Sequence, residues 1–116
     1  MSLAQITGLS LIEIVGDTGA KLFANNGGIL NLGIGVFGYI GVFIMLIVSL
    51  QGSTLMMVNG AWDGISGLLN TIYSYFILGE RFDDISQYFG LFLIIAGIYL
   101  LKVPLSKATP FKWPSF

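Results

Sequence analysis

Residues 29–50 read ILNLGIGVFGYIGVFIMLIVSL and contain no charged side chain. As a helix, a run of this length spans about 30 Å, which matches the hydrocarbon core of a bilayer. Three similar apolar runs surround it, at residues 3–23, 55–78 and 85–103. The sequence therefore predicts four transmembrane helices.

The composition independently indicates a membrane protein. The chain has 116 residues, of which 55% are hydrophobic and only 9% are charged, and its mean hydropathy is +0.88. A soluble domain carries about 25% charged residues. We predict an all-α membrane protein, because backbone groups must be satisfied within lipid and four segments are too few for a closed barrel.

Several classes of function are excluded by the same composition. The chain has no cysteine and no histidine, which removes disulfides, thiolate chemistry, His-based catalysis and the commoner zinc sites. The polar residues offer no nucleophile–base pair, so we expect no enzyme, no cofactor and no metal site. A net charge of −1 argues against nucleic acid as a partner.

We assign residues 1–103 to one transmembrane domain and residues 104–116, PLSKATPFKWPSF, to an irregular tail at the membrane interface. The first apolar run lacks a basic leader and is expected to be mature structure. Four spans place both termini on one side of the membrane. Three lysines lie on that side, against Lys21 and Arg81 on the other, so the charge bias barely fixes an orientation.

Two carboxylates interrupt the first apolar run. Ser10, Glu13 and Asp17 recur at three- and four-residue steps and share one helix face. Glu13 has no basic residue at helical spacing, and such a carboxylate within a membrane takes up a proton readily and marks a functional site. Asp17 precedes Lys21 by four residues, a spacing that favours an ion pair between them. The alternative to a functional role for Asp17 is therefore a purely structural ion pair with Lys21.

Polar and aromatic residues also follow one stripe of the third run, namely Asn59, Asp63, Ser66 and Asn70. Trp62 lies at mid-span, where an aromatic face suits a cavity for an organic cation. Gly90 and Gly97 lie seven residues apart on the fourth run, as in a helix-association seam. Because four helices enclose little more than their own side chains, we expect a second copy of the chain to complete a solute pathway.

These motifs together resemble the small multidrug resistance family of four-helix transporters, over nearly the whole chain up to Leu101. IEIVGDTGAK resembles the first-helix pattern, with Glu13 at the essential carboxylate and Lys21 at the loop lysine. Tyr39 matches the second-helix tyrosine. GAWDGISG resembles the third-helix motif, GERFD the following loop, and GLFLIIAG the dimerisation motif that contains Gly90 and Gly97.

The resemblance implies an antiparallel homodimer that exchanges protons for organic cations such as quaternary ammonium or guanidinium compounds. The paired first-helix glutamates bind protons or substrate alternately. We therefore expect a multi-pass antiporter of a cell (inner) membrane. The expected proton- and substrate-binding residues are Glu13, Trp62, Tyr39, Asp17, Asp63 and Asn59.

The chain departs from the family pattern within the expected site. Asp17 replaces a small or hydroxyl residue, Asn59 a tyrosine and Asp63 a small polar residue. We expect the added acids to favour a more highly charged or more polar cation. Two alternatives remain: a transport-inactive structural subunit of a larger membrane complex, docked through the tail, or a flippase-like component for lipid-linked substrates.

Overall fold

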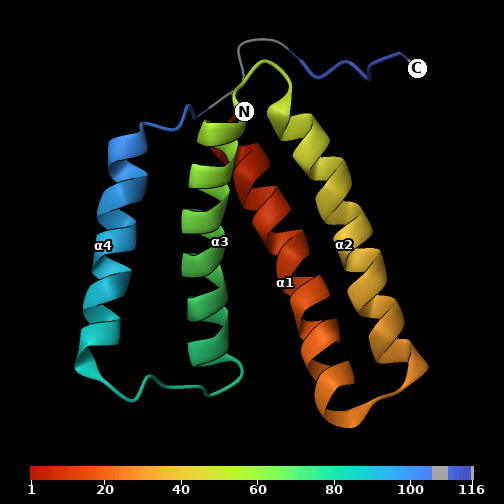
Figure 1. Ribbon diagram of the computed structural model, residues 1–116, viewed down its shortest axis with the longest axis vertical. Helices are drawn as coiled ribbons and strands as arrows, with labels where there is room; N and C mark the ends of the chain where they lie inside the picture. Colours follow the sequence, from red (N-terminus) through yellow and green to blue (C-terminus); the bar gives the residue numbers. More distant parts are fainter. Residues whose placement is uncertain (106–109, 116) are drawn as a thin grey trace.

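The computed structural model describes residues 1–105 and 110–115, which form four helices packed side by side (Figure 1). The helices are α1 (Leu3–Asn26), α2 (Ile29–Leu50), α3 (Leu55–Phe76) and α4 (Ile85–Leu101). The molecule measures 41 × 37 × 19 Å, so its shortest dimension is less than two helix diameters. The helices lie in one thin layer in the order α2, α1, α3, α4, and the predicted all-α, four-helix fold is confirmed.

Three helix boundaries differ from those expected of the apolar runs. α1 continues to Asn26 and stops where Gly27 takes a left-handed φ of 70°. α3 ends at Phe76 rather than at residue 78, just before a turn in which Gly79 has a φ of 72°. α4 ends at Leu101 rather than at residue 103, since Lys102 is left-handed and Pro104 cannot continue a helix.

Polar side chains determine where three of the helices begin. Ser2 accepts a hydrogen bond from the Gln5 amide at 3.2 Å, and Thr54 accepts one from the Met57 amide at 3.1 Å. Asp84 and Gln87 form a reciprocal capping box at the start of α4. Each cap satisfies backbone donors that a helix terminus leaves without partners.

Glycines bring α1 and α2 into backbone contact. A Cβ atom built on Gly38 would lie 2.5 Å from the Cα of Gly16, and one built on Gly19 would lie 2.5 Å from the backbone nitrogen of Gly35. No side chain fits at such a distance. The close approach places Tyr39 of α2 directly beside the polar face of α1.

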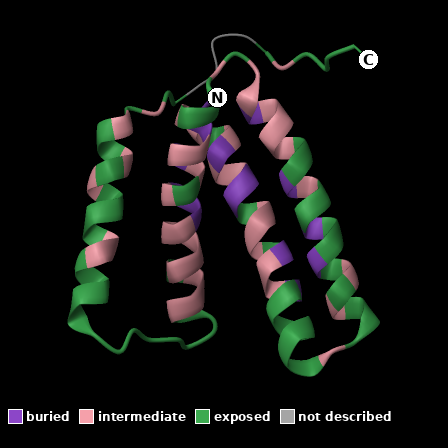
Figure 2. Ribbon diagram, viewed as in Figure 1, coloured by how far each residue is buried: buried purple, intermediate pink, exposed green. Residues whose placement is uncertain are grey.

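Side chains rather than glycines pack α1 against α3. Ile6 of α1 and Val58 and Ala61 of α3 are completely buried, and Ile65 of α3 is almost completely buried. Figure 2 shows buried residues on α1, α2 and α3, whereas α4 contains none. α4 packs on α3 alone among the helices, so α1 and α3 form the central pair of the layer.

Among the described residues, α2 is the one helix that is both long enough and apolar enough to cross a membrane by those two measures. α4 is apolar but has 17 residues. α1 and α3 are less apolar because they carry the acids of α1 and the polar stripe of α3. Large apolar side chains cover the outer surface, as Phe37, Phe43 and Phe92 illustrate with exposures of 74%, 63% and 62%.

The C-terminal tail is hydrogen-bonded to α1 and to the residue that follows α2: the Leu3 amide donates to the Pro104 carbonyl at 2.6 Å, and Gln51 bonds to Lys112. The Gln51 side chain donates to the carbonyl of Lys112 at 2.6 Å and accepts from its amide at 3.0 Å. Residues 110–115 form no helix or strand. The rest of the predicted interfacial tail, residues 106–109 and 116, lies outside the described residues.

Candidate functional site

Glu13 projects from the middle of α1 onto α3 and is partly buried there. Trp62 donates its indole N–H to Glu13 Oε2 at 2.6 Å, and Ser66 donates its hydroxyl to Oε1 at 2.5 Å. These donors are one helical turn apart on α3, so both oxygens of the carboxylate are engaged from the same helix. Both donors are neutral, and the charge of an ionised Glu13 is therefore not cancelled by them.

Asp17 lies one turn further along the same face of α1. Tyr39 of α2 donates its hydroxyl to Oδ1, and Asn70 of α3 donates its amide to Oδ2 at 3.4 Å. The structure thus brings Asp17 and Tyr39 together, as expected of two site residues. It also places Asp17 within reach of both neighbouring helices.

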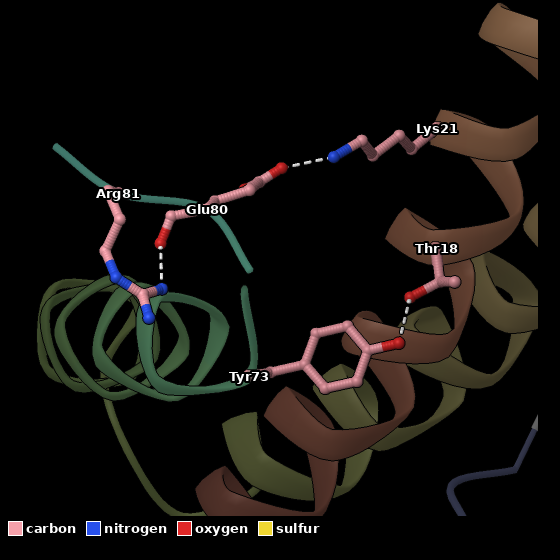
Figure 3. Close-up of polar contacts among 5 residues, drawn as sticks. All are labelled: Thr18, Lys21, Tyr73, Glu80 and Arg81. Atoms are coloured by element: carbon pink, nitrogen blue, oxygen red, sulfur yellow. Dashed lines mark hydrogen bonds and ion pairs between the residues drawn. The ribbon is translucent and has the colours of Figure 1, made fainter. Parts of the chain in front are cut away.

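The expected ion pair between Asp17 and Lys21 is wrong. Lys21 instead forms an ion pair with Glu80 in the α3–α4 loop, the one ion pair within the described part of the chain (Figure 3). Both side chains are about half exposed, at 47% and 48%. Lys21 lies near the C-terminal end of α1, where the exposed Glu80 of the loop is within its reach. Asp17 instead points into the helix layer.

A hydrogen bond between Asn70 and Ser66 joins the surroundings of the two carboxylates. The Asn70 amide nitrogen lies 3.3 Å from Ser66 Oγ and 3.4 Å from Asp17 Oδ2. Both residues lie on the polar stripe predicted for α3, but they are not among the expected site residues. Their four-residue spacing, which matches the spacing of Glu13 and Asp17 on α1, is the sequence signal that could have identified them.

Two expected site residues are not part of this hydrogen-bonded cluster. Asp63 is exposed and Asn59 is partly buried, and neither donates or accepts a side-chain hydrogen bond among the described residues. Asp63 follows Trp62 directly, so its side chain leaves the helix about 100° away from the indole. The cluster therefore consists of Glu13, Asp17, Tyr39, Trp62, Ser66 and Asn70.

Toward its C-terminal end, α1 contacts α3 and the α3–α4 loop through polar side chains. Thr18 donates to the hydroxyl of Tyr73 at 3.4 Å, and Lys21 pairs with Glu80 (Figure 3). The hydrogen bond from Lys21 lowers the pKa of the Glu80 carboxyl below its ordinary value. Arg81 is held over the ring of Tyr75, 3.6 Å from its centroid, and donates to the Tyr75 and Glu80 carbonyls.

The structure has a cavity that borders the cluster and a groove whose lining contains no cluster residue. A cavity of about 490 Å³ lies between α3 and the α3–α4 loop, with Asn70, Ser74 and Arg81 among its lining residues. A larger apolar groove of about 740 Å³ runs along α1 and α2, where Ile12 and Phe37 line it. Asn70 thus belongs both to the cavity and to the carboxylate cluster.

The two glycines predicted to mediate dimerisation lie on the open side of the layer. A Cβ atom built on Gly90 or Gly97 would meet no atom within 4 Å. α4 therefore presents a small-residue surface that no described residue of the single chain covers. Among the described residues, no group of three or more acids that could hold a metal ion occurs.

Two curated relatives identify the family of this chain. Multidrug transporter PA4990 of Pseudomonas aeruginosa is 30% identical over 91 residues, which cover 78% of this chain and 82% of that protein. Multidrug resistance protein EbrB of Bacillus atrophaeus is 29% identical over 90 residues, covering 78% of this chain and 76% of that protein. Neither a family model nor a solved structure matches the chain. The resemblance seen in the sequence is confirmed: the chain belongs to the small multidrug resistance family of four-helix membrane transporters.

Proposed function

We propose that this protein is a proton-coupled antiporter that exports small organic cations of the quaternary ammonium or guanidinium type. Glu13 binds a proton and the cation alternately. The relatives are named multidrug transporter and multidrug resistance protein, which supports drug efflux as the broader activity. The surroundings of Glu13 support the finer assignment.

The observation that carries this proposal is the hydrogen bonding of Glu13. Trp62 and Ser66 orient the carboxylate with two neutral donors, and the structure's one ion pair among the described residues is elsewhere, at Lys21. An ionised carboxylate in a low-dielectric site attracts whichever cation can reach it, a proton included. Mutually exclusive binding of proton and organic cation is the simplest form of exchange.

Aromatic side chains beside the acids suit an organic cargo. Trp62 lies against Glu13 and Tyr39 against Asp17, so each carboxylate is next to an aromatic ring. Aromatic faces attract cations that are too bulky or too poorly hydrated for a carboxylate alone. Asp17 adds a second negative charge to the cluster, which favours a polar or more highly charged cation.

We further propose that two antiparallel copies form the transporter in a cell (inner) membrane, with all four helices of each copy spanning the bilayer. The uncovered surface around Gly90 and Gly97 supports association through α4. In such a dimer the two Glu13 carboxylates face one pathway. Their inverted arrangement would allow the pathway to open to either side of the membrane in turn.

Proton release on cation binding tests the function directly. Purified protein in weak buffer is titrated with tetrapropylammonium and with guanidinium, and Glu13→Gln and Asp83→Asn are compared with wild type. Wild type and Asp83→Asn, whose acid lies in the exposed α3–α4 loop, are expected to release protons. Glu13→Gln is expected to release none, because the neutral amide holds no titratable proton.

Absence of release from folded wild-type protein would contradict the antiporter. The structural-subunit alternative then predicts a partner protein that co-elutes in fixed ratio under mild detergent. The flippase-like alternative predicts binding of an anionic or glycosylated lipid.

A further inference from the structure

One amide of α3 serves both carboxylates of α1. A carboxamide nitrogen carries two N–H donors and a serine hydroxyl carries one. The nitrogen of Asn70 lies within hydrogen-bond distance of Asp17 Oδ2 and of Ser66 Oγ. With Ser66 accepting from Asn70, the serine proton is free to point at Glu13 Oε1, 2.5 Å away.

The direction of these hydrogen bonds follows from the chemistry of the amide. The nitrogen of Asn70 can only donate, so Asp17 and Ser66 both accept from it. Ser66 in turn donates to Glu13. Every bond in the chain therefore delivers a donor toward a carboxylate, and such bonds stabilise the charge of their acceptor.

Of the other titratable groups on the elements packed against α1, only Tyr39 is hydrogen-bonded to Glu13 or Asp17 among the described residues. Lys21 is engaged by Glu80, and Tyr73 of α3 contacts Thr18. Asp63 of α3 is exposed, and its side chain makes no hydrogen bond among the described residues. Tyr39 of α2 donates to Asp17 and is the one group that shares a carboxylate with Asn70.

We propose that Asn70 is a positioning residue that holds Glu13 and Asp17 as one cation-receptive pair. Its donors keep both carboxylates oriented, directly at Asp17 and through Ser66 at Glu13. Asn70 also lines the 490 Å³ cavity beside the α3–α4 loop, so the amide that joins the two carboxylates borders this cavity. This inference rests on the proposed cation–proton exchange.

The test measures the affinity for tetrapropylammonium at neutral pH in wild type, Asn70→Leu and Asn31→Leu, and in Asp17→Asn with and without Asn70→Leu. Leucine has nearly the shape of asparagine but no donor. Asn31 serves as the matched control, since its amide bonds only to the Gly27 carbonyl at the start of α2. At neutral pH, Asn70→Leu is expected to lose about tenfold in affinity, the usual consequence of removing a hydrogen bond to a charged group.

A double-mutant comparison distinguishes positioning from a packing defect. The loss caused by Asn70→Leu is expected to be smaller in the Asp17→Asn background than in wild type, because Asn70 and Asp17 share one interaction. Equal loss in both backgrounds, or no loss beyond that of Asn31→Leu, would overturn the inference while cation-driven proton release from wild type still supported the antiporter. Absence of that release would instead reject the proposed function itself.

Discussion

At the scale of single residues, the energetics of Glu13 leave room for a cation. Removing a carboxylate from water costs several kcal/mol even after the protein relaxes. A hydrogen bond to a charged acceptor contributes about 1.5–3 kcal/mol, so Trp62 and Ser66 offset much of this cost but leave the negative charge without a counterion. A bound proton or organic cation can neutralise that charge. Strong hydrogen bonding without charge neutralisation is therefore the property that suits Glu13 to the proposed exchange.

Lys21 illustrates how solvent decides between two possible ion pairs. Asp17 is one turn away on the same helix, yet Lys21 pairs with Glu80, which lies 59 positions further along the chain. Asp17 is already bonded to Tyr39 and Asn70, and the flexible lysine reaches water more easily than it reaches the helix layer. The pair ties the end of α1 to the α3–α4 loop.

The pH dependence of stability should reveal this pair. The hydrogen bond from Lys21 lowers the pKa of Glu80 below its ordinary value of 4.5. A lowered pKa in the folded state means that the stabilisation is complete above the ordinary value and is lost as the pH falls through the folded one. Glu80→Gln should therefore melt slightly below wild type at pH 7, with the two curves merging in acid. The pair is exposed, so the difference should be small and should weaken in high salt.

Thermal unfolding in detergent, followed by circular dichroism, measures this effect. Asp83→Asn is the control, because Asp83 lies in the same loop and forms no ion pair among the described residues. A melting difference for Glu80→Gln that persisted unchanged into acid would show that the glutamate stabilises the fold by other means.

At the scale of the helices, α1 uses two different kinds of interface. Toward α2 it presents glycines whose backbones touch, and toward α3 it presents Ile6 and the carboxylates. Close backbone contact gives α2 little freedom to shift, and that fixes the position of Tyr39 relative to Asp17. Side-chain packing with hydrogen bonds can adjust more easily than backbone contact.

Alanine at Gly38 should destabilise the α1–α2 pair. Its Cβ would lie 2.5 Å from the Cα of Gly16, and such overpacking costs about 1–3 kcal/mol. Gly33→Ala on the same helix is the control, because its Cβ would meet no atom within 4 Å. That change should be neutral or stabilising by up to about 1 kcal/mol, since alanine favours a helix over glycine.

The free energy of unfolding in a denaturant titration compares the two variants. Equal stability of Gly38→Ala and Gly33→Ala would mean that the helices can separate at little cost.

At the scale of the whole molecule, the thin layer leaves α4 without a partner on its outer side. α4 has no buried residue, and the helix packs on α3 alone among the helices. Its exposed surface combines aromatic side chains such as Phe89 and Phe92 with the small residues Gly90 and Gly97. Small residues permit the close helix approach that drives association in lipid.

Isoleucine at Gly97 should weaken the proposed dimerisation through α4. A branched side chain would hold the two α4 helices apart, and we expect self-association to fall by about tenfold or more. Gly33→Ile is the control, because Gly33 of α2 also faces open space in the single chain. Energy transfer between labelled copies in vesicles measures the association. Unchanged transfer in Gly97→Ile would place the dimer contact on another surface.

The sequence by itself determined the fold class, the number of helices and the family. Apolar runs of bilayer length allow only helices, and local caps such as Ser2 and Asp84 mark where they begin. Glu13 and Trp62 stand out by residue type in an apolar background, whereas Tyr39 was assigned from the family resemblance.

Only the tertiary structure decided which polar groups meet. In the structure Lys21 pairs with Glu80, and Asp17 is hydrogen-bonded to Tyr39. Ser66 and Asn70 donate to the carboxylates. Asp63 and Asn59 form no hydrogen bond with the cluster among the described residues. Helical periodicity places residues on a face of their own helix but contains no information about the rotation of the neighbouring helix. That rotation is set by contacts across the interface, here by the glycines between α1 and α2 and by Ile6 against Val58 between α1 and α3.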